Sequence, residues 1–198
     1  LSAGQDLVLA AGQRYDAGAS LSVSAGRALV RGGSADPAVD GVLLSSGGSI
    51  TLSAGRDITV ARNGLAVSDG DLLADAARRL VLATHDSTAG IQNYALGAGG
   101  NATLRFTDLG QDDIFSGALA IGGDLQFVQR AAGRGMTNLR FANGSRLDVG
   151  GTVRAGRDDF NSGSAFEIYL DAGATWIANA FDLELARLDI QNGAVFRG

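Results

Sequence analysis

A short motif recurs along this chain: a glycine, two further residues, and then apolar residues at alternate positions. It is clearest in segment 47–60, where Gly55 is followed by Ile58 and Val60. Alternate residues of a strand point to the same face, so each copy predicts a tight turn followed by a short strand with one apolar face. The motif starts at eight positions: Gly4, Gly26, Gly47, Gly55, Ala77, Gly99, Gly122 and Gly150.

The spacing of these copies predicts a solenoid. The sequence numbers of successive starts differ by 22, 21, 8, 22, 22, 23 and 28. We interpret this as coils of about 22 residues that each carry more than one strand, with Gly47 and Gly55 starting two strands of a single coil. One coil cannot bury its apolar face alone, whereas stacked coils bury it in ladders of like residues. The expected fold is therefore all-β, a right-handed parallel β-helix, because parallel connections nearly always take that hand.

The composition agrees with a β protein that is rich in turns. The chain has 30 glycines, about twice the usual share, with one proline and no cysteine. Collagen is excluded because glycine does not recur at every third position. Residues 71–83 also fit the apolar stripe of a helix, but we favour strand there because Ala77 falls midway between Gly55 and Gly99, at the expected step from each.

We expect one continuous solenoid over residues 1–198. Residues 1–104 carry the regular repeats, whereas residues 105–198 are less regular and contain all eight phenylalanines and the only tryptophan. Neither end shows a polar capping repeat. We therefore expect the chain to be an internal piece of a longer one, with flanking coils or a partner covering both ends.

The charge pattern argues against nucleic acid as a partner. The chain has 16 basic and 21 acidic residues, a net charge of −5, and all of its basic residues are arginine. These arginines are scattered along the repeats, whereas nucleic-acid binders concentrate basic residues in a patch. No run approaches the roughly 18 apolar residues of a membrane-spanning helix, so none is predicted.

Two phrases resemble a known family. Segments 53–60 (SAGRDITV) and 2–9 (SAGQDLVL) are similar to the haemagglutinin-type repeats of filamentous haemagglutinins, which are large exoproteins of Gram-negative bacteria secreted by the two-partner route. The resemblance covers residues 1–104. It implies a long right-handed β-helical fibre, passed through the outer-membrane transporter of a two-partner secretion system and secreted or held at the cell surface. There it would serve adhesion, biofilm cohesion or presentation of a toxin. The amino-terminal secretion domain of that family has no counterpart here.

Three aromatic residues of the second half are candidates for ligand binding: Tyr169, Trp176 and Phe181. Aromatic rings exposed on a rigid β surface can stack on sugar rings and so form a carbohydrate-binding face. The alternative is that they fill a widened interior of the solenoid, because they lie in a region of alternating strand pattern.

Two acidic pairs, Asp112-Asp113 and Asp158-Asp159, lie in irregular inserts of the second half. Neighbouring carboxylates on loops can bind Ca²⁺ or act as acid and base on a glycosidic bond, and solvated turn positions are the alternative. The only histidine, His85, is interpreted as a turn residue because the partners of a catalytic histidine usually come from distant positions. We predict no metal site, no cofactor and no catalytic residue.

The sequence thus predicts a non-enzymatic segment of a secreted bacterial surface adhesin. Such a fibre would mediate attachment to host-cell receptors, glycans or the exopolysaccharide of a biofilm, and could contribute to virulence. Two alternatives stay open. One is a β-helical polysaccharide-active enzyme, such as a lyase or a tailspike-like glycosidase, and the other is a passive stalk that presents a distal toxin domain.

Overall fold

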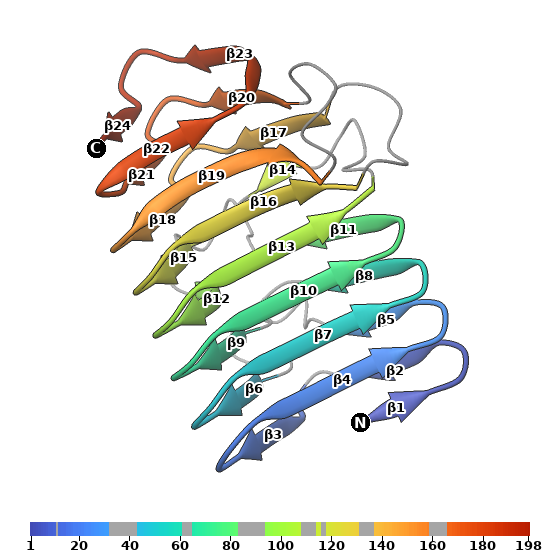
Figure 1. Cartoon of the computed structure of the whole chain (residues 1–198). Coiled ribbons are helices and arrows are strands. Elements are labelled where there is room, and N and C mark those ends of the chain that lie inside the picture. The colour runs from blue at the N-terminus through green and yellow to red at the C-terminus, as the bar shows by residue number, and fades with distance from the viewer. Residues whose placement is uncertain are drawn as a thin grey trace.

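The computed structural model describes residues 1–10, 12–31, 43–60, 65–82, 94–107, 114–115, 118–130, 137–158 and 166–198. Within these ranges the chain forms strands and no helix. The strands pair in parallel in four stacked sheets, consistent with a parallel β-solenoid (Figure 1). The prediction of an all-β fold built from parallel strands is therefore confirmed.

Every three consecutive strands form one coil, and each coil contributes one strand to each of three faces. Sheet 1 contains β1 (Ser2–Ala3), β4 (Leu21–Ala25), β7 (Ile50–Ala54), β10 (Leu72–Ala76), β13 (Ala102–Phe106), β16 (Leu125–Gln129), β19 (Thr152–Arg157) and β22 (Ala180–Leu183). Sheet 2 contains β3 (Arg14–Ala17), β6 (Leu43–Ser46), β9 (Leu65–Ser68), β12 (Tyr94–Ala98), β15 (Ala118–Ile121), β18 (Arg146–Val149), β21 (Thr175–Ile177) and β24 (Val195–Arg197).

The third face is divided between two shorter sheets. Sheet 3 serves the first half of the chain and contains β2 (Leu7–Leu9), β5 (Leu29–Arg31), β8 (Asp57–Val60) and β11 (Arg79–Leu82). Sheet 4 serves the second half and contains β14 (Ile114–Phe115), β17 (Thr137–Phe141), β20 (Phe166–Leu170) and β23 (Leu185–Ile190). The first coil and the last lie at opposite ends of the stack (Figure 1).

The coils differ in length. Residues paired across sheet 1 include Ser2–Ser24, Leu21–Ile50, Ile50–Leu72, Leu72–Ala102, Ala102–Leu125, Leu125–Val153 and Thr152–Ala180. The sequence numbers of the partners differ by 22, 29, 22, 30, 23, 28 and 28. The expectation of one coil length throughout therefore does not describe the stack.

The sequence motif belongs to two different corners of the coil. Four copies, starting at Gly4, Gly26, Gly55 and Ala77, lead into the strands of sheet 3, and the other four lead into sheet 1. Gly47 and Gly55 do start two strands of one coil, β7 and β8, as predicted. The interpretation of the whole series as one nearly even repeat is wrong, because the step from Ala77 to Gly99 passes from one corner to the other.

Residues 71–83, which also fitted a helix, contribute two strands as predicted. Leu72, Ala74 and Ala76 of β10 are buried, and the residues between them are partly exposed. This alternation with a period of two is the pattern of a strand with one buried face. β11 follows after a short turn and includes Leu80, which is also buried.

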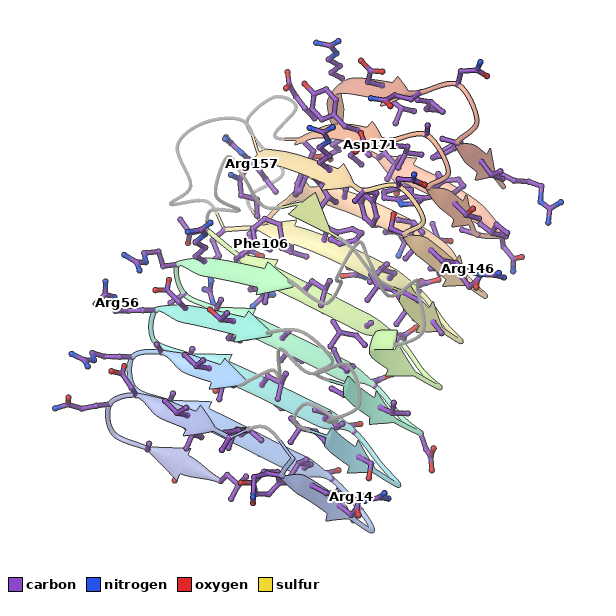
Figure 2. All side chains as sticks on the ribbon, turned by 180° about the vertical axis from the view of Figure 1, so that it is seen from behind. Arg14, Arg56, Phe106, Arg146, Arg157 and Asp171 are labelled. Carbon is purple, nitrogen blue, oxygen red and sulfur yellow. The ribbon has the colours of Figure 1, made fainter. Side chains whose placement is uncertain are left out.

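Inward-facing residues from all coils form one continuous core cluster. Leucine, isoleucine, valine and alanine fill it in the first half. In the second half much larger side chains enter: Phe106, Phe141, Phe166 and Trp176, all fully buried. Charged side chains such as Arg56 and Arg146 point away from the coils (Figure 2). The outer faces are therefore the surfaces available to a ligand.

Candidate functional site

A groove of about 440 Å³ lies on the outer face of sheet 1, in the second half of the chain. It crosses β13, β16 and β19 and reaches the end of β22. Its lining residues are Arg105, Gln126, Phe127, Val128, Arg154, Ala155, Gly156, Arg157, Asp158, Asp182 and Glu184. Its volume falls within the range of about 300–1,000 Å³ that is usual for small-molecule sites.

The groove exists because β19 carries a glycine on its outer face. Val153 and Ala155 of this strand are buried, so Gly156 faces outward. Its neighbour on β16 is Val128, and on the other side the backbone N–H of Glu184 donates to the carbonyl of Ala155 at 2.9 Å. With no side chain between these neighbours, Gly156 forms part of the floor of the groove.

Arginines approach this floor from two strands. Arg105 of β13 pairs in register with Val128, and its Nη2 lies 3.8 Å from Asp158 Oδ1, too far for a hydrogen bond. The Arg105 Nε is buried and has no hydrogen-bond partner among the described residues. Arg154 lies between two carboxylates, with Asp124 and Asp182 each 3.5 Å away. The guanidinium of Arg105 is thus incompletely neutralised by the residues that the structure describes.

Carboxylates line the opposite side. The Glu184 side chain leans over the groove floor, so that a Cβ added at Gly156 would lie 3.1 Å from Glu184 Oε2. Within the ranges that the structure describes, the Glu184 carboxylate makes no hydrogen bond and no ion pair. The side chain of Asp182 is 72% exposed. The groove therefore presents hydrogen-bond donors and acceptors that the protein itself leaves incompletely used.

A second hollow, of about 360 Å³, lies further back along sheet 1, but its polar groups serve the fold. Asp71 Oδ1 accepts from the backbone N–H of Asn101 at 2.7 Å, and Asn101 Oδ1 accepts from that of Asp124 at 2.9 Å. Asp124 Oδ1 accepts in turn from the N–H of Thr152 at 2.7 Å. This polar ladder ties successive coils together and leaves few groups for a ligand.

Ion pairs between coils line the corner between sheets 1 and 3. Arg27 hydrogen-bonds Asp6 on the coil before it, and Arg78 hydrogen-bonds Asp57 in the same way. These bonds hold the pKa of both Asp6 and Asp57 below the ordinary value. Both pairs are substantially exposed to solvent, so they link coils without forming an enclosed site.

The predicted aromatic residues do not form one face. Trp176 is fully buried and packs edge-on against Phe141, with ring centroids 4.5 Å apart. Phe181 is partly buried and stacks on Trp176 and on Phe196, at 6.0 and 4.2 Å. The alternative of core filling is therefore correct for Trp176. It offers no exposed ring to a sugar.

Tyr169 faces outward on sheet 4 but is already engaged by its neighbours. Its hydroxyl donates to Glu167 Oε2 at 2.6 Å, and the guanidinium of Arg187 lies 5.4 Å from its ring centroid. Arg187 in turn donates to Asp189 Oδ2 at 2.9 Å. The hydrogen bond to Glu167, together with burial, raises the pKa of the Tyr169 hydroxyl.

Of the predicted acidic pairs, the structure describes only Asp158, which lines the groove at the end of sheet 1. Asp112, Asp113 and Asp159 lie outside the described residues, as does His85. Within the described part, no three histidine, cysteine or acidic residues gather closely enough to hold a metal ion.

The main groove residues were not among the sequence candidates. Arg105, Arg154 and Gly156 occupy outward positions of their strands, and Asp182 and Glu184 come from the next coil. Aligning the motif copies that lead into sheet 1 would have placed Arg105, Val128 and Gly156 in one row across three neighbouring strands. The signal was present in the sequence, but it was spread over four successive coils.

The stretches of chain that the structure describes include no helix with the length and apolar character needed to cross a membrane. No protein-family model matches this chain, and comparisons with curated proteins and with solved structures found no match either.

Proposed function

We propose that this chain is a segment of a secreted bacterial surface fibre, an adhesin of the filamentous haemagglutinin type. The proposal includes a right-handed coil and export through the outer-membrane transporter of a two-partner system. The observation that carries it is the unbroken stacking of eight parallel strands in each of the two long sheets, with a polar groove on the outer face of one. A stiff stack that displays a binding surface is what an attachment fibre needs.

Stiffness follows from the bonds between coils. Eight strands at about 4.8 Å per step span roughly 35 Å, and backbone hydrogen bonds run along the stack on every face. The polar ladder and the pairs Arg27–Asp6 and Arg78–Asp57 add side-chain links between coils. Bending would strain many of these bonds together. The fibre can therefore hold its groove away from the cell, and repeated weak contacts along it can add through avidity.

The phrase that resembles the haemagglutinin repeats has a physical role in this stack. Segments 2–9, 24–31 and 53–60 lie one above another at the corner between sheets 1 and 3. Glycine suits this turn because a Cβ at Gly55 would lie 2.1 Å from the carbonyl oxygen of Gly26. Small residues in the turn favour close stacking of coils, and Arg27 of the second segment donates a hydrogen bond to Asp6 of the first. This packing role of the small turn residues supports the resemblance to the haemagglutinin repeats, and the packing itself is argued from the structure alone.

The purified chain provides the test. We expect fluorescently labelled protein to bind cultured epithelial cells or biofilm exopolysaccharide in a saturable way, measured by flow cytometry and by co-sedimentation. Unlabelled chain should compete for the sites, and acid-unfolded chain is the control for non-specific adsorption. Failure to bind either target would support the passive stalk instead.

A second candidate function rests on the carboxylates of the groove. Asp158, Asp182 and Glu184 line one cavity with Arg105 and Arg154, and acidic and basic groups on an outer β face could act on a glycosidic bond. Incubating the chain with polysaccharides and measuring released reducing ends or unsaturated products tests this reaction. Turnover that disappears in both Asp158→Ala and Glu184→Gln would favour an enzyme over an adhesin.

A further inference from the structure

We propose that the groove above Gly156 is a binding site for a neutral saccharide. This inference rests on the proposed function and deepens it, because it assigns the chemical class of ligand and the residues that hold it. Three properties of the groove support it: its charge balance, its unused hydrogen-bonding groups and its floor.

The charges of the described residues that line the groove cancel. These residues include three arginines and three carboxylates: Arg105, Arg154, Arg157, Asp158, Asp182 and Glu184. An anionic sugar would gain from the arginines but would be repelled by the carboxylates beside them, and a cationic ligand would meet the reverse. A neutral ligand meets neither repulsion, so charge balance selects against uronates, sulfated glycans and polyamines.

The hydrogen-bonding groups of the groove need a partner that can both donate and accept. The Glu184 carboxylate, unpaired within the described chain, can only accept, whereas the guanidiniums of Arg105 and Arg154 can only donate. A hydroxyl group does both. Neighbouring hydroxyls of a sugar can therefore donate to Glu184 or Asp182 and accept from an arginine, in charge-assisted hydrogen bonds.

The floor suits the ring itself. It is formed by the backbone of Gly156 beside the side chain of Val128, with acidic and basic side chains around it. Carbon-bound hydrogens of a sugar ring can lie on this apolar strip while the hydroxyls turn outward to the charged rim. The volume of about 440 Å³ is large enough for a small ligand of this kind.

A side chain introduced at Gly156 would fill the floor of the groove, so a substitution there is the most direct test of the saccharide site. In Gly156→Val the new Cβ would meet only the flexible end of Glu184, at 3.1 Å, and its branched side chain suits an outward strand position. The matched control is Gly97→Val, a glycine of β12 in sheet 2, where the nearest atom to an added Cβ is 3.6 Å away. Glu184→Gln is a second variant, which keeps the shape and removes the charge.

The experiment measures binding of the labelled chain to immobilised linear gluco-, manno- and galacto-oligosaccharides, with polygalacturonate and heparin as charged comparators. We expect saturable binding to at least one neutral series, unchanged in Gly97→Val. Blocking the floor in Gly156→Val should lower affinity at least about tenfold, because the site loses its volume. Glu184→Gln should weaken binding several-fold, because the hydrogen bonds that it accepts are no longer charge-assisted. Circular dichroism and Trp176 fluorescence confirm that each variant is folded.

Three results would overturn the inference: no binding to any neutral series, binding to the charged polymers alone, or neutral binding that Gly156→Val leaves intact. The adhesin proposal has a separate outcome. If one of these three results is found while the parent still binds cells, the saccharide site is wrong and the adhesin role stands. If the parent binds neither cells nor biofilm matrix, the adhesin role itself fails.

Discussion

Successive coils approach closely at their corners, and this predicts how alanine substitutions at two corner glycines change the stability of the chain. Gly122 lies at the turn between β15 and β16, directly above Gly99 of the preceding coil. A Cβ at Gly122 would lie 2.3 Å from the carbonyl oxygen of Gly99, well inside any tolerated contact. Gly122 itself is exposed to solvent, so burial alone would suggest that Gly122→Ala is harmless.

The size of the effect follows from the shift that alanine would force. Carbon and oxygen atoms approach to about 3.3 Å at closest, so the turn must move by about 1 Å. That movement works against the bond from Gly122 N–H to the Ala98 carbonyl, which is 2.8 Å long. Forced overpacking costs about 1–3 kcal/mol and a weakened hydrogen bond about 1 kcal/mol, against a gain of about 0.4–1 kcal/mol from a less flexible unfolded chain. We expect a net destabilisation of about 1–3.5 kcal/mol.

Gly18 is the matched control, because it occupies the same corner on the first coil. A Cβ added there would have no atom within 4 Å, and its backbone is not in the left-handed region. Gly18→Ala should then show only the effect on the unfolded chain, a stabilisation of about 0.4–1 kcal/mol. The same substitution at the same corner is thus expected to change stability in opposite directions.

Urea unfolding followed by fluorescence measures both variants. The chain has one tryptophan, Trp176, and it is fully buried, so its emission reports on the core. Comparing midpoints at equal slope separates a change in stability from a change in the extent of unfolding. If Gly122→Ala and Gly18→Ala have equal midpoints, the coils do not approach as closely as described and the reasoning is refuted.

Two further predictions concern side-chain links between coils. Asp124→Ala removes the acceptor of the Thr152 N–H and should destabilise the chain by about 1 kcal/mol in urea unfolding. Asp124→Asn should be nearly neutral, because the side-chain oxygen of Asn101 already accepts such a bond on the preceding coil. Equal losses of stability in the two variants would contradict the polar ladder. Arg78 lowers the pKa of Asp57, so the stabilisation is complete above the unfolded-state pKa of about 3.9 and is lost as the pH falls through the lower folded value. Asp57→Asn should therefore lose less stability than the parent between about pH 5 and pH 3, and identical acid profiles would count against the pair.

Much of the local structure could be predicted from the residues. The small residue that precedes each alternating apolar run, glycine in seven copies and Ala77 in the eighth, marks a turn and a short strand, and all eight copies of the motif precede a strand. Even the ambiguous segment 71–83 contributes strands, and in β10 the buried residues Leu72, Ala74 and Ala76 keep a period of two. These features are local, since the direction of a side chain along a strand depends only on the residues beside it.

The candidate site could not be found in that way, because it depends on which residues lie side by side on neighbouring coils. Gly156 opens a groove only because Val128 and Glu184 flank it, and these come from different coils. The step between paired residues of sheet 1 changes from coil to coil, so no constant spacing in the sequence identifies such neighbours.

The position of Trp176 also depends partly on the local sequence and partly on tertiary packing. Alternation could place its side chain on one face of a strand, but whether that face met the core or the solvent was decided by the packing of Phe141 and Phe181 against it. Strand and turn follow from short-range sterics and from alternation of apolar residues. The alignment of coils, and with it the groove, follows from turn lengths and long-range packing, which become definite only when the chain is stacked.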